Sequence, residues 1–375
     1  MNSGIQMTLM IGPAVPIPVS REVLDALTSV QVTTSTEGPG AFQLSFELSR
    51  TSPLHTLFLV AGGITPPLVR VVIAVTVNGT TDVLIDGVMT NHQVTGGGAG
   101  QNPTLTVTGE DLTRVMDYID FSGIPYPAMP DFARVLLILA KYAVFGAIPM
   151  VIPSVLIDVP LPMDRIPLHQ GKDLGYVKAL AERVGYVFYH EAGPVPGVSR
   201  FYWGPEIKVG APQPALNIDM DAHTNVDSLS FSYDAESATL PIMLIYLKET
   251  HTPIPIPVPS ITPLSPPLGL IPPIPKQIEW ITGLAKYSPV QAAAIGLARA
   301  AKTAEAVKAT GSLNVLRYGR VLQARRLVGV RGAGTAFDGL YYVRSVTHNL
   351  KRGEYTQDFE LSRNGLVSTV PTVPA

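Results

Sequence analysis

Cysteine is absent from the 375 residues, and charged residues make up only 15% of them. The missing thiols exclude disulfide frameworks, iron–sulfur clusters, cysteine-ligated zinc and thiol nucleophiles. Charged residues usually supply about a quarter of a soluble protein, so the low fraction indicates that much of the surface is covered, for example by other subunits. The formal net charge of −2 lacks the basic excess of a nucleic-acid binder. We therefore expect no nucleic-acid binding.

The usual signatures of catalysis and of nucleotide binding are also missing. Gly197-Val198-Ser199 lacks the second glycine of a nucleophile elbow. Gly96–Gly100 and Arg331–Gly334 do not open a helix, so they are interpreted as turns rather than phosphate loops. Glu110 and Asp111 are adjacent at an expected helix start and do not face one another. We expect no enzyme activity, no catalytic residues and no cofactor.

One group of residues has the composition of a metal site. Asp219, Asp221 and His223 alternate, which on a strand would place them on one face. No second histidine lies near, and the His190-Glu191 pair has Pro194 where a zinc helix needs its second histidine. The seven histidines are scattered and are interpreted as turn or surface residues. We expect a solvated strand end and no metal.

Secretion and membrane signals are not found. Met1–Ser20 has no Lys or Arg and is broken by prolines, unlike a signal peptide. Residues 131–145 are too short to span a bilayer, and 252–275 contain too many prolines for a membrane helix. The sequence predicts no signal peptide, no membrane span and assembly in the cytoplasm.

The 35 prolines and 33 glycines divide a chain that is long enough for two or three domains. Residues 1–110 are predicted to be a β unit. Phe42–Ser49 and Thr104–Thr108 alternate apolar and polar residues. Val69–Val77 and Thr80–Met89 flank Asn78-Gly79, the preferred two-residue hairpin turn.

Residues 111–215 are predicted to be an α+β lobe. Leu112, Val115, Met116 and Ile119 share one helical face. Asp131 and Asp173 are predicted to cap two further helices, ending near Phe145 and at Gly185. A strand is expected over Tyr186–Tyr189.

The remainder is predicted to be a second β unit with an insertion. Strands over Leu216–Met220 and Ser228–Tyr233 begin this unit in residues 216–240. Residues 241–309 hold an extended polyproline arm over 251–275 and a helix from Ser288 to about Ala309, ended by Gly311. A long hairpin, Leu340–Leu350 with Tyr355–Arg363, completes it in residues 310–366. Residues 367–375 are a short tail.

Two blocks resemble a known family. Gly339–His348, Gly353-Glu354-Tyr355 and Phe359–Arg363 resemble the end of the phage late control gene D protein family, which supplies baseplate hubs of contractile tails. The hub half of type VI spike proteins is similar. A second block resembles the family pattern through Gln170, Asp173, Tyr176, Leu180, Ala181 and Gly185, with Lys172 a departure from a small hydroxyl residue. The resemblance covers about residues 21–366.

The resemblance implies a mainly β, α+β fold with two tube-like β-barrels around an inserted lobe. It implies a homotrimer whose six barrels adapt a threefold spike to a sixfold tail tube, in a phage or injection particle. The partners expected are a separate spike protein, since residues after Leu366 are too few for a needle, the tail-tube protein and other baseplate proteins. A tail-tube initiator, a glycan-binding β protein and a peptidoglycan-degrading enzyme remain alternatives.

Overall fold

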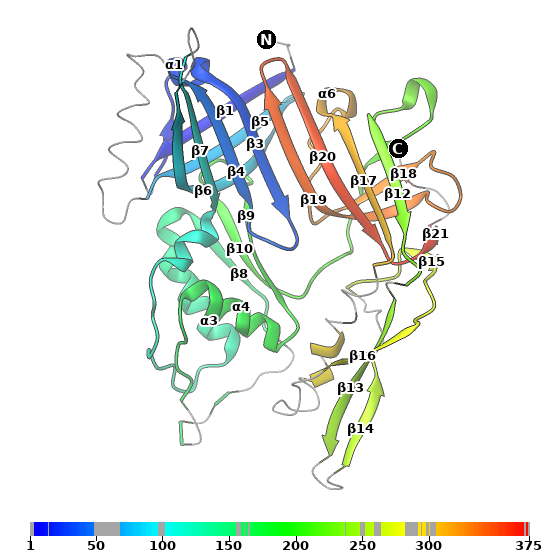
Figure 1. The fold of residues 1–375 in the computed structure, drawn as a ribbon. Helices are drawn as coiled ribbons and strands as arrows, with labels where there is room; N and C mark the ends of the chain where they lie inside the picture. Colours follow the sequence, from blue (N-terminus) through cyan, green and yellow to red (C-terminus); the bar gives the residue numbers. More distant parts are fainter. Residues whose placement is uncertain are drawn as a thin grey trace.

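A wide β-sheet crosses the upper part of the molecule, with a mixed lobe below one end and a narrow β projection below the other (Figure 1). The structure is a computed structural model that describes residues 4–13, 15–48, 68–96, 102–154, 159–160, 162–163, 166–236, 238–247, 252–258, 264–281, 292–293, 295–297, 300, 305–370 and 373. These parts confirm the expected mainly β, α+β class.

The wide sheet has 13 strands, most of them antiparallel. Its main path runs β12-β17-β20-β19-β3-β4-β7-β6-β5-β1-β2, and β18 joins β11 to β19. The strands are β1 Ile5–Gly12, β2 Ile17–Pro18, β3 Leu27–Ser35, β4 Ala41–Glu47, β5 Arg70–Val77, β6 Thr80–Thr95, β7 Thr104–Asp111, β11 Gln213–Asn217, β12 Ser228–Tyr233, β17 Val307–Asn314, β18 Leu327–Arg331, β19 Gly339–Lys351 and β20 Glu354–Arg363. Two short helices, α1 Arg21–Ala26 and α6 Val315–Tyr318, lie at its edge.

The two expected β units are joined into one sheet. Residues Ser29–Ser35 of β3 pair antiparallel with Ser345–Lys351 of β19, seven residue pairs in all. In place of two separate closed barrels, the described strands form this continuous sheet, with β12 and β2 at its ends. The sheet bends around one core, because Leu9 of β1 and Leu44 of β4 belong to the same buried cluster as Tyr341 of β19.

Local turn chemistry places both long hairpins where the sequence predicts them. Asn78 and Gly79 have φ angles of 49° and 82°, the left-handed values that a type I′ turn requires. They connect β5 to β6. Gly353, with φ 82°, turns β19 into β20. Both hairpins are confirmed.

The lobe packs helices against a three-stranded sheet of order β8-β10-β9. Its elements are the 3₁₀ helices η1 Leu112–Asp117 and η2 Lys141–Phe145, the helices α3 Asp131–Ala140 and α4 Asp173–Arg183, and the strands β8 Ala147–Val151, β9 Val187–Ala192 and β10 Ser199–Gly204. The apolar helical face predicted over residues 112–119 is shorter in the structure. Leu112 and Met116 are buried, but the helix ends before Ile119, which is 57% exposed.

The predicted helix caps at Asp131 and Asp173 are wrong. Each is the first residue within its helix, after Pro130 and Lys172 respectively, and neither caps a backbone amide. The Asp131 carboxylate instead pairs with Arg134. The Asp173 carboxylate accepts from the Tyr142 hydroxyl, so both carboxylates are held by side chains rather than by a helix-capping amide. The predicted stop at Gly185 is confirmed by its φ of 71°.

The projection is a three-stranded sheet of order β14-β13-β16, with β13 Thr239–Leu247, β14 Thr252–Pro257 and β16 Gln277–Ile281. An extended polyproline arm was expected over 251–275, and the described residues 252–257 of this range form a strand paired with β13. Pro253, Pro255 and Pro257 alternate with residues whose amides face β13, as Val258 N–H does toward Pro241. The outer edge of β14 therefore lacks N–H donors at the prolines, which blocks further strand pairing. Farther along, β15 Gly269–Ile271 pairs with β21 Leu366–Ser368.

The last predicted helix ends earlier than expected. Residues 292–293, 295–297 and 300 are helical, and the expected start at Ser288 lies outside the described residues. Strand β17 begins at Val307, so Ala309 and Gly311 lie in the sheet. A Cβ at Gly311 would lie 2.4 Å from the Ser228 carbonyl oxygen. The glycine thus serves close strand packing rather than a helix end.

A buried ion pair anchors the lobe to the sheet. Arg70 of β5 donates to both carboxylate oxygens of Asp86 on β6, at 2.7 and 2.6 Å. The side chains are only 2% and 0% exposed. Arg70 Nη2 also donates to the carbonyl oxygen of Gly197 in the β9–β10 turn, at 3.1 Å. A bidentate charged contact therefore crosses from sheet to lobe.

Replacing one partner of this pair is expected to destabilise the chain more than replacing both. Arg70→Met leaves Asp86 buried without its cation, which costs about 3–5 kcal/mol of unfolding free energy. The double variant with Asp86→Leu removes both buried charges and should recover a large part of that loss. Urea denaturation followed by circular dichroism measures the difference. A double variant less stable than the single one contradicts the assignment.

Candidate functional site

The candidate metal residues do not share a strand face. Asp219 and Asp221 have φ angles of 51° and 48°, and Asp221–His223 form the 3₁₀ turn η3. The period-2 geometry predicted for them is therefore wrong, because the chain turns after β11. Within the described ranges no group of three or more His, Asp or Glu side chains is arranged to hold a metal ion.

The glycine-containing motifs at 197–199 and 331–334 include turns. Gly197, at φ 83°, turns β9 toward β10, and Gly332 and Gly334, at φ 90° and 86°, follow β18. This agrees with the turn interpretation. Asp111 lies at the start of η1 as expected, and its carboxylate accepts from the Thr113 amide at 3.0 Å. Residues 97–100 of the glycine-rich loop lie outside the described part.

The expectation of surface histidines is wrong at three positions. His169, His190 and His348 are only 1%, 8% and 4% exposed. The sequence held a signal for His348, since alternation places it with Val346 and Leu350, which face the core. His169 and His190 are buried only because the lobe folds over them, and that packing has no local signature.

An uncharged polar row crosses the exposed face of the sheet. One residue from each of seven adjacent strands, β17 through β6, lies in register in this row: Asn314, Thr356, Asn349, Gln31, Gln43, Thr108 and Asn91. All are exposed or half-buried. We call the surface around this row the polar sheet face. It spans both β units without interruption.

Side chains on the polar sheet face bond to one another across strands. Gln31 donates to Asn349 at 3.1 Å, and Asn349 donates to Asp358 at 2.7 Å. Thr33 and Thr347 share a hydrogen bond of 3.1 Å across the β3–β19 seam. Such cross-strand pairs stabilise a sheet.

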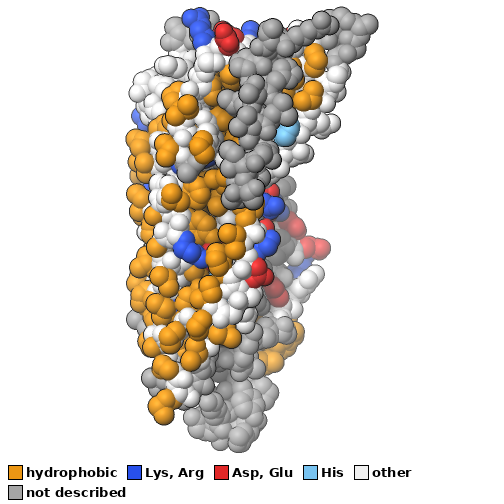
Figure 2. All heavy atoms as spheres, turned by 90° about the vertical axis from the view of Figure 1, so that its left-hand side faces the viewer, with side chains coloured by type: hydrophobic (Ala, Val, Ile, Leu, Met, Phe, Trp, Pro, Cys, Tyr) orange, Lys and Arg blue, Asp and Glu red, His pale blue; other side chains and the backbone are white. Residues whose placement is uncertain are grey.

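Helix α3 and the following η2 are apolar on both sides. Val135, Ile138 and Leu139 are buried in the lobe core. On the outer side Leu136, Leu137 and Val144 are 46%, 51% and 64% exposed. We call these three residues, with the exposed Ala140 and Ala143, the α3 outer stripe. Figure 2 shows hydrophobic side chains gathered over the face that runs from the lobe to the adjoining sheet. A helix that is apolar all round is normally buried.

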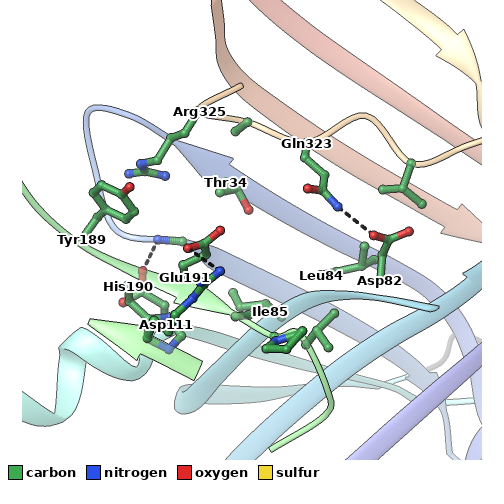
Figure 3. Close-up of a pocket in the computed structure, with 18 of the residues that line it drawn as sticks. Thr34, Asp82, Leu84, Ile85, Asp111, Tyr189, His190, Glu191, Gln323 and Arg325 are labelled. Atoms are coloured by element: carbon green, nitrogen blue, oxygen red, sulfur yellow. Dashed lines mark hydrogen bonds and ion pairs between the residues drawn. The ribbon is translucent and has the colours of Figure 1, made fainter. Parts of the chain in front are cut away.

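A cavity of about 400 Å³ lies where the two β units meet the lobe. Its walls come from β6, from β9 and from the segment before β18, and they include Asp82, Tyr189, His190, Glu191 and Arg325 (Figure 3). We call it the junction cavity. Burial raises the pKa of Asp82, and the hydrogen bond from Gln323 Nε2, 2.7 Å long, opposes that rise. Burial also raises the pKa of Tyr189 to about 12 and lowers the pKa of His190.

The second block of the resemblance surrounds a buried carboxylate. Asp173 is fully buried and accepts from the Tyr142 hydroxyl at 2.6 Å. It also lies 2.9 Å from His169 Nε2 and 2.6 Å from Lys141 Nζ. Tyr176 accepts from Arg134 at 2.6 Å. These contacts fasten the segment before α4 to α3 and η2, so the block positions the lobe's helices.

Comparison with known proteins identifies the fold. The chain is similar to a tail protein from Neisseria meningitidis, with 12% identity, a TM-score of 0.62, and coverage of 97% of this chain and 98% of that one. It is also similar to the 43 kDa tail protein of prophage MuSo2 from Shewanella oneidensis, with 12% identity, a TM-score of 0.59, and coverage of 96% and 98%. A chain of the Francisella PdpA–VgrG complex is matched over all of this chain and 60% of its own length, with 7% identity and a TM-score of 0.60.

The sequence itself matches no protein-family model and no curated protein. The likeness is therefore one of fold, which the chain shares with phage and prophage tail proteins. No helix in the described part of the chain is long and apolar enough to cross a membrane.

The buried His348 is expected to make stability depend on pH. Its Nδ1 lies 3.1 Å from the Gln357 amide nitrogen, which can only donate, and 2.8 Å from the Tyr355 hydroxyl. The ring proton therefore resides on Nε2, and burial lowers the His348 pKa from 6.5 to about 3. Below about pH 6.5 the His348 ring binds a proton in the unfolded chain but stays neutral in the folded chain. The free energy of unfolding therefore decreases as the pH is lowered, by about 2 kcal/mol from about pH 7 to about pH 5.

Urea denaturation at both pH values measures this dependence. His348→Gln should reduce the slope by about one proton, whatever its effect on absolute stability. His92→Gln, at an exposed position, is the matched control and should leave the slope unchanged. An unaltered slope in the His348 variant refutes the assignment.

Proposed function

We propose that this protein is a structural hub of a contractile phage tail or related injection system. In the proposal three chains form a ring, and each contributes its two β units, so six similar β units face a sixfold tail tube. A threefold spike protein binds the opposite side. The fold shared with tail proteins supports a tail or baseplate role, and the threefold arrangement is part of the proposal.

The observation that carries the proposal is the continuous sheet with its polar face. One row of amide and hydroxyl side chains crosses seven strands from both β units. In the ring this face lines the channel. A row of uncharged polar side chains offers passing cargo neither a charge nor an apolar patch to bind.

The α3 outer stripe supports a partner-covered lobe. Exposed leucines on a helix that is already apolar inside cost free energy in water, by about 25 cal/mol per Å² of apolar surface. Covering them against a neighbouring chain removes this cost. The low charged fraction of the sequence, 15%, agrees with such coverage. We assign the stripe to the contact between neighbouring chains of the ring.

A spike partner is supported by one of the comparisons. The matched Francisella chain belongs to a structure described as a PdpA–VgrG complex, and a further match is described as a component of the type VI secretion system. We propose by analogy that this chain contacts a spike, the tail-tube protein and other baseplate proteins. The protein acts in the proposal by symmetry matching, without catalysis.

The glycan-binding alternative loses support from the tryptophans. Such a protein presents aromatic rings in a groove, and the sequence has only two tryptophans. Trp203 is 0% exposed in the lobe core, while Trp280, 51% exposed, lies in the separate β16 projection. They cannot form one binding groove.

Leu137→Glu is expected to prevent assembly while leaving the chain folded. The side chain is 51% exposed, so the charge is tolerated in the free chain but not in a desolvated contact. Gln43→Glu adds the same charge on the polar sheet face and should assemble normally. Native mass measurement with the co-expressed spike should give three chains per spike trimer for the wild type and the control. A stable monomer in the presence of the spike refutes the ring, and equal assembly of both variants refutes the assigned contact.

A further inference from the structure

The guanidinium of Arg325 lines the junction cavity. No hydrogen bond or ion pair joins the Arg325 guanidinium to a described residue; it lies over the Tyr189 ring, 4.2 Å from the ring centre. Tyr189 stacks in turn on Tyr202, with ring centres 4.9 Å apart and planes inclined by 28°. This stack fixes the plane of the guanidinium. Figure 3 shows Arg325 and Tyr189 facing each other at the cavity wall.

Four other charged groups of the cavity wall, those of Arg200, Glu191, Asp111 and Asp82, have close partners. Arg200 Nη2 lies 3.1 Å from Glu191 Oε2. Asp111 accepts from the Gly40 amide at 2.6 Å and from the Thr113 amide at 3.0 Å. Asp82 accepts from Gln323. Asp111 and Glu191 act on Arg325 as nearby charges, but neither makes a hydrogen bond or a close ion pair to its guanidinium.

The backbone directs Arg325 to this position. Its φ of 62° is left-handed, a conformation that is unfavourable for a residue with a Cβ. Hydrogen bonds from the Arg325 amide to the Val343 carbonyl and from the Val343 amide to the Arg326 carbonyl, both 2.9 Å, hold this conformation. A strained backbone maintained by its surroundings is common at binding sites.

We propose that the junction cavity binds a carboxylate group, held by the fork of Arg325. The planar fork of a single guanidinium matches a planar carboxylate. A phosphate dianion fits worse, because Asp82, Asp111 and Glu191 line the same walls. The volume of about 400 Å³ is within the range of small-ligand sites. The carboxylate belongs either to a small molecule or to an acidic side chain of a partner protein.

A carboxylate bound in the junction cavity would lie between three parts of the chain. The cavity walls come from β6 of the first β unit, β9 of the lobe, and the segment before β18 of the second unit. A bound carboxylate therefore restrains the lobe relative to the sheet. This inference goes beyond the hub proposal and is tested on the isolated chain, so its failure leaves the ring proposal standing.

Calorimetric titration of the full-length protein tests the site. The probes are N-acetyl-Gly-Glu-Gly-amide, its Gln counterpart and propionate. The glutamate peptide or propionate should bind, and the glutamine peptide should bind at least about tenfold more weakly, as expected for the loss of a charge-assisted hydrogen bond. If propionate binds as tightly as the glutamate peptide, the carboxylate belongs to a small molecule. If the peptide binds more tightly than propionate, the carboxylate belongs to a segment of a partner protein.

Two variants locate the binding. Arg325→Gln should weaken it at least about tenfold, whereas Arg320→Gln, an exposed arginine in the same segment that does not line the cavity, should change it less than about twofold. Circular dichroism checks that each variant folds, and the Glu-to-Gln probe comparison on the wild type needs no variant. Absence of binding by both carboxylate probes at millimolar concentration overturns the proposal. An equal loss in both variants also overturns it.

Discussion

The antiparallel pairing of β3 with β19 is the interaction on which the rest of the structure depends. It joins residues 29–35 to 345–351, so two β units from opposite ends of the chain form one sheet. Because each backbone group in an antiparallel ladder has one possible partner, this register also fixes the side chains on both faces. Val30 and Leu350 face the core as a pair, and Gln31 and Asn349 meet on the other side. The polar sheet face and the position of the lobe both follow from that register.

Charged side chains are few, and those that are buried connect different parts of the fold. Arg70 and Asp86 bring the β9–β10 turn to the sheet, and Asp173 gathers groups from η2 and from the segment before α4. Glu305 similarly receives Lys208 at 2.7 Å and also Arg344. Although burial opposes ionisation, these two cations lower the Glu305 pKa. A buried charge whose partner is removed is costly, so each contact tolerates only a narrow set of arrangements between the parts. The junction cavity lies where three parts meet, and there the Arg325 guanidinium makes no hydrogen bond or close ion pair to a described residue.

Local signals in the sequence predicted turns, hairpins and helix faces correctly where residues close in the chain determine the structure. The Asn78-Gly79 turn, the hairpin closed by Gly353 and the buried face of α4 agree with the structure. Predictions failed where other side chains or neighbouring strands compete for the same group. Asp131 and Asp173 are good capping residues, but Arg134, Tyr142 and His169 take their carboxylates. Gly311 has the chemistry of a helix stop, yet strands β12 and β20 pack closely around it. Of the candidate site, alternation indicated His348 on the core face, whereas nothing in the sequence joins Tyr189 to Arg325.

The sequence by itself determined the mainly β class, the hairpins, the amphipathic helices and the scarcity of charge, because these depend on residue type and on spacings of a few positions. Only the tertiary structure decided that two β units share one sheet, that polar residues from seven strands align in one row, and that three parts enclose a cavity. Strand pairing selects among many segments of similar alternation, and the choice depends on how all of them close around a common core. Residues 31 and 349 are adjacent for that reason, and no local pattern records it.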